Sequence, residues 1–314
     1  MIARFAAAVA TVLALLGPVS LAAQDVRPTV PSEADVAISE GRLADAESML
    51  FSASSAAPRD PAARGALGLF LASRGRLKVG AVLLEEARQF GGDAAVVETR
   101  LARIDAWLGD WAGFAALKHY AATGPAHERA LWLMTHPTAH SGPDTVAVAL
   151  EPNEIAGLGR VVLTIGAASI TADIDPSVDG LVLPSSAGVT AESKQFGMHD
   201  SASVAVVYAL EIGALRLVNV PARLSPAARP SIGLDVLAAF TPTFDAAQQL
   251  LTLWRHPVPQ DGELLPFVLG FPGVGFVARA GQPLVRMESA AGRAALRGSR
   301  WSFDLRRGAI VVLP

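Results

Sequence analysis

The spacing of hydrophobic residues changes once along the chain, near residue 140. Between residues 32 and 135, apolar side chains recur at three- and four-residue steps, as at Leu77, Ala81, Leu84 and Ala87, which places them on one face of a helix. Beyond residue 145 the apolar residues form short runs separated by turn residues, which is typical of β-strands. The pattern therefore predicts a helical part followed by a β part.

The helical part contains a repeated pattern. Three glycines recur every 34 residues, and two columns of large apolar residues keep the same register; these sets are Gly41, Gly75 and Gly109, then Leu43, Leu77 and Trp111, then Met49, Leu83 and Leu117. A 34-residue period of paired helices resembles the tetratricopeptide repeat, whose stacked helices commonly bind a peptide or another subunit in a concave groove. The aromatic positions of that repeat are mostly absent, so an irregular array of α-hairpins is the alternative for residues 24–135.

The β part contains three segments that resemble, in order, parts of a retropepsin-like aspartic protease. Residues 170–188, "ITADIDPSVDGLVLPSSAG", are similar to the active-site strand and turn of that family. The segment "LEIGALRLVNV" resembles the strand pair after the flap, and "SIGLDVLAAFTPTFDAAQQLLTL" resembles the Gly-x-Asp segment and the closing hairpin. The resemblance implies an acid-protease β-barrel over residues 145–256, with extra strands from residue 257 to 314.

On this resemblance Asp175 takes the place of the catalytic aspartate. The family's chemistry needs two carboxylates that share a proton, one activating a water and the other protonating the peptide carbonyl. The sequence has no second Asp-Thr-Gly or Asp-Ser-Gly motif. An active form would therefore be a homodimer that pairs Asp175 with its copy in a second chain.

The residues around Asp175 depart from the family pattern. Pro176 stands in place of Thr or Ser, Ser177 in place of Gly, and Asp179 where Ser is common. Proline offers neither a hydroxyl nor an N–H, and a side chain at 177 is expected to crowd a position that uses the freedom of glycine. Asp173, two residues earlier on the strand, is expected to face the same side and to oppose ionisation of Asp175. The motif is therefore interpreted as degenerate.

Two other patterns offer alternative chemistry. Asp173, Asp175, Ser177 and Asp179 alternate like the ligands of a calcium loop, but Val178 and Pro184 stand where such loops need glycine and glutamate. His136 and His140 have a metal-ligand spacing, yet the segment 135–144 is predicted to be a linker because Pro137 interrupts it. We expect no metal and no cofactor.

The last segment, residues 257–314, is predicted to form strands. Its "WSFDLRRGAIVVL" echoes the earlier "PTFDAAQQLLTLW" in placing Phe-Asp before a turn and an apolar strand. Two interpretations follow, a β extension that caps the barrel and a vestigial second half, and the first is favoured.

The N-terminal residues indicate where the protein is located, and the composition limits its chemistry and its partners. Residues 1–23 have the charged start, apolar run and small-residue end of a signal peptide, with cleavage after Ala22, and an uncleaved anchor is the alternative. We expect a periplasmic or secreted bacterial protein without a membrane span after cleavage. The chain has 314 residues, no cysteine and a formal charge of −3, which excludes disulfides and thiol chemistry and disfavours nucleic acid as a partner.

Together these features predict an exported protein with a tetratricopeptide-like array and a retropepsin-like barrel. The favoured function is binding of a peptide or a partner protein without cleavage. The alternatives are a homodimeric aspartic endopeptidase that uses Asp175 from each chain, and a barrel that serves only to dimerise the repeats.

Overall fold

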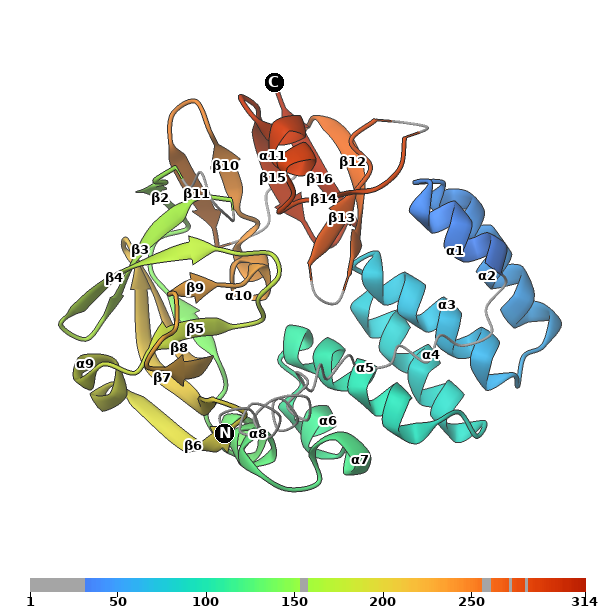
Figure 1. The fold of residues 1–314 in the computed structure, drawn as a ribbon, viewed down its shortest axis with the longest axis horizontal. Helices are drawn as coiled ribbons and strands as arrows, with labels where there is room; N and C mark the ends of the chain where they lie inside the picture. The colour runs from blue at the N-terminus through green and yellow to red at the C-terminus, as the bar shows by residue number, and fades with distance from the viewer. Residues whose placement is uncertain (1–31, 153–157, 256–260, 271–272, 280–281) are drawn as a thin grey trace, which may run out of the picture.

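The computed structural model describes residues 32–152, 158–255, 261–270, 273–279 and 282–314. The predicted signal peptide lies outside these residues. Helices form the N-terminal part, and two β-sheets form the rest (Figure 1). In Figure 1 the helices run along the right and lower sides, one sheet lies on the left, and the other lies at the top. No helix in the described segments is long and apolar enough to cross a membrane.

In the part of the chain that the structure describes, eight helices precede the first strand. They are α1 (Ser32–Ser39), α2 (Leu43–Ala56), α3 (Pro61–Ser73), α4 (Leu77–Gln89), α5 (Ala94–Leu108), α6 (Trp111–Ala115), α7 (Lys118–Ala121) and α8 (Pro125–Thr135). Aspartates begin several of them, as Asp60 accepts from the Ala62 N–H at 3.0 Å and Asp93 from the Ala95 N–H at 3.0 Å. These contacts satisfy donors that a helix start leaves free. Asp60 and Asp93 therefore cap the starts of α3 and α5.

The three glycines of the 34-residue pattern occupy equivalent turns. Gly41, Gly75 and Gly109 have φ angles of +76°, +80° and +67°, and they lie between α1 and α2, α3 and α4, and α5 and α6. This left-handed conformation is one that a residue with a Cβ adopts only with strain. The apolar residue two positions later begins the next helix and is buried in each case, at Leu43, Leu77 and Trp111. The repeated sequence pattern thus marks three helix–glycine–helix hairpins.

The first sheet closes into a barrel. Its strands are β1 (Ala139–Ser141), β3 (Arg160–Ile165), β4 (Ala168–Ile174), β5 (Leu181–Pro184), β6 (Ser193–His199), β7 (Ala202–Ile212), β8 (Leu215–Ser225) and β9 (Ser231–Ile232), with the short helix α9 (Ala187–Ala191) before β6. Their order is β1-β8-β5-β9-β4-β3-β7-β6, and a further pairing of β8 with β7 closes the ring. The strands β1 and β6 lie outside the closed ring, where β1 pairs with β8 and β6 pairs with β7.

Crossed connections lie at one end of the barrel. Strand β9 lies between β4 and β5, parallel to the first and antiparallel to the second. The turn at residues 175–180, which joins β4 to β5, therefore crosses the segment that leaves β9. The Gly233 N–H donates to the Gly180 carbonyl at 2.8 Å, which ties the two connections together.

The second sheet combines an early strand with the C-terminal segment. Its order is β14-β13-β12-β16-β15-β10-β11-β2, where the members are β2 (Thr145–Ala149), β10 (Thr243–Asp245), β11 (Leu250–Trp254), β12 (Glu263–Leu269), β13 (Val274–Phe276), β14 (Val285–Arg286), β15 (Arg300–Asp304) and β16 (Ala309–Leu313). Residues 145–256, the range predicted for the barrel, thus contribute to both sheets. The predicted linker at 135–144 contains β1, which pairs with β8.

The sequence echo in the second sheet corresponds to two similar hairpins. Short helices precede both: α10 (Leu234–Leu237) and a 3₁₀ turn (Ala238–Phe240) come before β10, and α11 (Ala290–Leu296) comes before β15. In each hairpin the aspartate caps its own turn, since Asp245 accepts from the Gln248 N–H at 2.8 Å and Asp304 from the Arg306 N–H at 3.0 Å. The two hairpins lie side by side through antiparallel pairing of β10 with β15. The repeated Phe-Asp motif therefore has the same local role twice.

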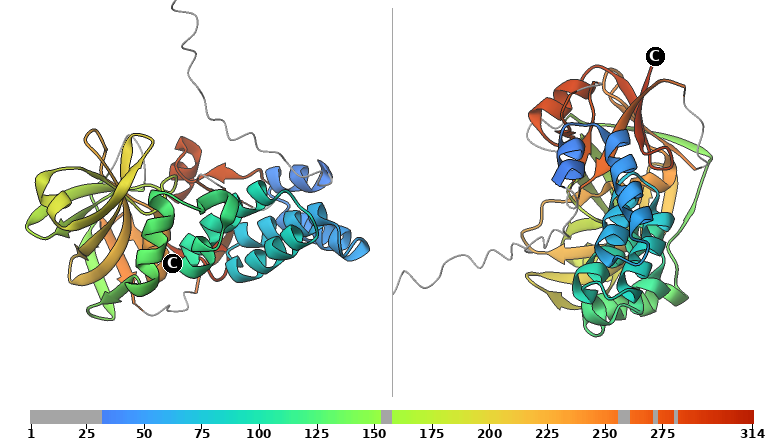
Figure 2. Two further views of the ribbon diagram at one scale, coloured as in Figure 1. Left: turned by 90° about the horizontal axis from the view of Figure 1, so that it is seen from below. Right: turned by 90° about the vertical axis from the view of Figure 1, so that its right-hand side faces the viewer.

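One hydrophobic core connects the helices from α3 onward with both sheets, and α1 to α3 share a second core with Val277. Figure 2 shows the barrel at one end of the molecule and α1–α4 at the other, with the second sheet between them. The helical array therefore contacts the second sheet near α3 and the barrel near α8.

Candidate functional site

The turn that carries Asp175 is held by its own hydrogen bonds. Asp175 lies one residue beyond the end of β4, and its N–H donates to the Ile232 carbonyl at 3.0 Å. Its Oδ1 accepts from the Ser177 N–H at 2.8 Å and from the Ser177 hydroxyl at 2.6 Å. The side chain of Asp175 is half-buried, and Pro176 is buried. The carboxylate is thus fixed within the turn, as in an Asx turn.

The side chain of Ser177 was expected to crowd the turn, but the structure shows a different role. Its φ is not positive, so the position does not need the backbone freedom of glycine. Instead of crowding the turn, the hydroxyl adds a second donor to the carboxylate that the backbone N–H already binds. The expected clash at residue 177 is therefore absent.

Asp173 also differs from its expected role. It is a β4 residue with 5% exposure, and it forms an ion pair with the Arg229 side chain. Strand alternation was expected to place it beside Asp175, but Asp175 has already left the strand. Asp173 is therefore directed to a separate partner.

Asp179 connects the turn to the helical array. Its Oδ2 lies 2.6 Å from Nη2 of Arg103, a residue of α5. The two side chains are 44% and 26% exposed, so the pair is partly open to solvent. This ion pair brings a helix of the same chain onto the aspartate turn.

A second carboxylate lies under the same turn. Both oxygens of Asp235, in α10, accept from the Gly180 N–H, at 3.0 and 2.8 Å. Burial and, to a smaller extent, the negative charge of Asp179 raise the pKa of Asp235 to about 7, against the lowering effect of the backbone donors. Asp235 therefore gains its charge in a neutral rather than an acidic range.

Arg129 of α8 adds a half-buried cation at the helix–barrel interface. Its guanidinium carbon lies 5.9 Å from the centre of the Trp111 ring, a cation–π distance. The pKa of Arg129 is lowered to about 10, chiefly by burial and also by the charge of Arg223, against the raising effect of Tyr120 and Asp235. The interface between helices and barrel thus has charges of both signs.

Sequence reasoning did not single out Arg103, Arg129 or Asp235. Only Asp235 left a signal, because it belongs to the quoted segment "SIGLDVL". The two arginines stand on helices with no motif around them, and a helical arginine usually indicates a solvated surface. Their role depends on contacts between residues that are distant in the sequence.

The metal-binding alternatives receive no geometric support. Asp173 and Asp179 pair with different arginines, and Ser177 donates to Asp175, so the four alternating oxygen ligands do not share a centre. Within the described segments no group of three or more His, Asp or Glu could hold a metal ion.

The two histidines with metal-ligand spacing have structural surroundings of their own. The His136 ring stacks on Trp132 at a centroid distance of 4.2 Å. His140, in β1, contacts the Phe240 ring edge-on at 5.0 Å.

Comparisons with known proteins give a likeness among solved structures. No family model matches the chain, and no curated protein matches it. Among solved structures, the chain is similar to a retropepsin-like aspartic protease from Rickettsia conorii, with 13% sequence identity and a TM-score of 0.28. The match covers 37% of this chain and 91% of that protein.

Proposed function

We propose that this chain is an exported, non-catalytic binding protein in which an aspartic-protease-like barrel and a helical array together hold an extended peptide or a partner protein. The single observation that carries the proposal is the ion pair between Arg103 and Asp179. It brings α5 of the same chain onto the turn of Asp175. A second barrel would have to approach this turn to supply a second aspartate.

The carboxylates around the turn support the same conclusion. Acid proteolysis needs two carboxyl groups that share a proton and hold a water between them. Here Asp175 is bound within its own turn, Asp173 pairs with Arg229, and Asp235 accepts from the backbone of Gly180. Each group has a separate partner, and this arrangement does not form a dyad within one chain.

The homodimeric endopeptidase remains a second candidate because of Ser177. Its backbone N–H donates to the Asp175 carboxylate at 2.8 Å, which is the contact that the family's glycine is expected to supply. Displacement of α5 from the turn would leave this carboxylate supported and open to a second copy. The two candidates therefore differ in whether the helices stay in place.

A direct test compares wild type with Asp175→Asn on a mixed peptide library between pH 4 and pH 7. We expect equal and negligible cleavage from both, and a monomer by mass measurement at tens of micromolar. The protein is taken from the periplasmic fraction, and its intact mass should show loss of the first 22 residues, as cleavage after Ala22 requires.

Arg103→Gln provides the matched variant for the alternative. It removes the ion pair between α5 and the turn and leaves Asp175 intact. Cleavage by wild type or by Arg103→Gln that disappears in an Asp175→Asn background would overturn the non-catalytic proposal. A full-length mass from the periplasm would overturn the predicted signal cleavage alone.

A further inference from the structure

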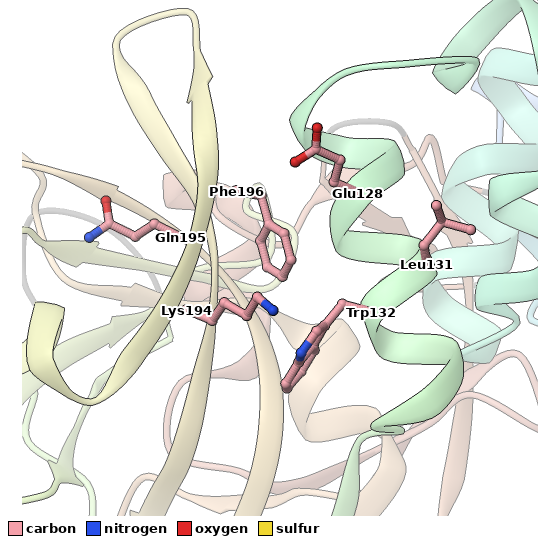
Figure 3. Close-up of a pocket in the computed structure, with 6 residues that line it drawn as sticks. All are labelled: Glu128, Leu131, Trp132, Lys194, Gln195 and Phe196. Atoms are coloured by element: carbon pink, nitrogen blue, oxygen red, sulfur yellow. The ribbon is translucent and has the colours of Figure 1, made fainter.

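A groove between α8 and β6 lies apart from the Asp175 turn. It is an open depression with a volume of about 430 Å³, and its lining residues are Glu128, Leu131, Trp132, Lys194, Gln195 and Phe196 (Figure 3). The side chains of Lys194 and Phe196 point from the strand toward the helix, and Trp132 points from the helix toward them. The depression is open, a shape that suits a chain segment lying across it better than an enclosed small molecule.

Aromatic rings form one part of the groove. The Trp132 and Phe196 rings lie 6.2 Å apart at an angle of 61°. A β-bulge lies between Gln195 and Gly197, so Phe196 is the extra residue of β6 and has no partner in β7. Bulges of this kind redirect a side chain. Here the redirected ring faces the helix.

The groove also presents one charge of each sign. Nζ of Lys194 lies 5.4 Å from the Trp132 ring centre and 5.5 Å from that of Phe196. Glu128 stands at another part of the rim. Among the residues that the structure describes, neither Lys194 nor Glu128 has an oppositely charged group within 4.0 Å. The ammonium is therefore available to a carboxylate from outside.

Exposed apolar side chains continue beyond the groove. Leu131 and Met134 on α8 are 48% and 49% exposed, and Tyr208 on β7 is 43% exposed with its ring 6.3 Å from that of Trp132. An exposed apolar cluster on adjacent elements is typical of an interaction surface. It extends past the hollow, which favours a polypeptide over a small molecule.

Strand β6 supplies the remaining feature. It is the last strand in the order of the barrel sheet and, among the residues with described positions, pairs with β7 on one side only. The free edge of such a strand can bond the main chain of an added strand, while alternate side chains enter the neighbouring pocket. The surface thus combines a strand edge for backbone pairing, an apolar site formed by aromatic rings, and the Lys194 cation.

We infer that this groove binds an extended segment of a partner protein as a strand added to β6. A large apolar side chain sits against Trp132 and Phe196, and a carboxylate two residues along the segment faces Lys194. The spacing follows from the alternation of side chains in a strand. This inference rests on the proposed binding function and adds where the partner binds and what it must carry.

The test titrates the full chain with the acetylated and amidated peptide Gly-Thr-Phe-Thr-Glu-Thr-Gly, followed by NMR of labelled protein. Two related peptides carry Lys in place of Glu, or Ala in place of Phe. We expect wild type to prefer the Glu peptide over the Lys peptide by about tenfold, the ratio that corresponds to one exposed charge pair with an added hydrogen bond. The Ala peptide should bind more weakly than the Glu peptide.

The decisive variant is Lys194→Glu, with Lys78→Glu as its control. Lys78 is exposed on α4, outside the groove, so this change alters the net charge equally. Lys194→Glu should reverse the preference toward the Lys peptide, whereas Lys78→Glu should leave it unchanged. An unchanged preference in Lys194→Glu, or no binding of any peptide at millimolar concentration, would overturn the inference.

The outcomes also separate this inference from the proposed function. Cleavage that depends on Asp175 contradicts the proposed function and leaves the charge reversal at Lys194 as an independent result. Absence of both cleavage and groove binding overturns only the placement of the partner at β6. Leu131→Ser, at an exposed position, gives a second check and should weaken both charged peptides equally.

Discussion

The helical array contacts the β part in two ways. Near its N-terminal half, backbone meets backbone: Gly75 lies against the Leu305 carbonyl, and Gly308 lies against the Arg74 carbonyl. Near its C-terminal half the contacts are made by side chains, including Arg103 with Asp179 and Trp132 with Phe196. The first contact is set by shape and should depend little on pH or salt. The second is set by charge and aromatic packing and should respond to both.

Substitution at Gly75 should have the largest effect. A Cβ there would lie 1.9 Å from the Leu305 carbonyl oxygen, and φ is +80°. Gly75→Ala therefore combines a backbone collision with a strained conformation, and we expect a loss of about 2–4 kcal/mol in the free energy of unfolding. Denaturant unfolding followed by circular dichroism measures it.

Gly109→Ala is the matched control. Its φ of +67° is similar, but a Cβ there meets nothing within 4 Å. It should cost only the conformational strain, about 1 kcal/mol. Equal losses at the two positions would show that the close approach of Gly75 to the second sheet contributes nothing.

At the second contact, we expect the free energy of unfolding to depend on pH because of Asp235, which lies under the turn that α5 contacts. Its pKa of about 7 in the folded protein exceeds the ordinary value of 3.8, so the folded state keeps a proton that the unfolded state releases. The stabilisation is complete below about pH 4 and is lost as the pH rises through 7. Asp235→Asn should flatten this fall, by about 1–3 kcal/mol between pH 4 and pH 8.

Two further variants sharpen the result. Asp200→Asn changes a side chain that is 81% exposed and should keep the wild-type slope. Burial, together with the charges of Asp110 and Glu85, raises the pKa of the Asp105 carboxyl in the helical array to about 7. Asp105→Asn removes this carboxyl. This variant should also flatten the fall of the free energy of unfolding with pH, but it should leave the hydrogen exchange of the barrel amides unchanged. A slope in Asp235→Asn equal to that of wild type contradicts the burial of Asp235 beneath the turn.

The same division explains what could be predicted from the sequence. The helix–glycine–helix hairpins were visible because each depends on residues close together, a glycine in the turn and an apolar residue two positions later. The Asp175 turn was visible for the same reason. Strand β1 was missed because three exposed residues, Ala139 to Ser141, carry no apolar pattern and depend on β8 for pairing.

Contacts between distant segments left little trace in the sequence. Arg103 has no motif around it, and its partner Asp179 belongs to a turn that the chain reaches only after three more helices and four strands. The hydroxyl of Ser177 was read as an obstacle because its bond to Asp175 depends on how the turn is folded. The local sequence was enough to predict helices and strands, whereas the fold determines which charged side chains come into contact.

The smallest expected effect belongs to the ion pair on which the functional proposal depends. Arg103 and Asp179 are partly exposed, so solvent screens their attraction, and either Arg103→Gln or Asp179→Asn should cost about 0.5–1 kcal/mol. A double-mutant cycle measures the coupling, which should fall as salt rises from 0.05 to about 1 M. The exchanged pair, Arg103→Asp with Asp179→Arg, should recover part of it. Since the coupling is small, packing of α5 in the shared hydrophobic core, as at Leu101 and Ile104, must also hold the helix in place. A coupling of zero at low salt, together with unchanged exchange of the turn amides in Arg103→Gln, would mean that α5 does not bind the turn in solution and would remove the main support for a non-catalytic barrel.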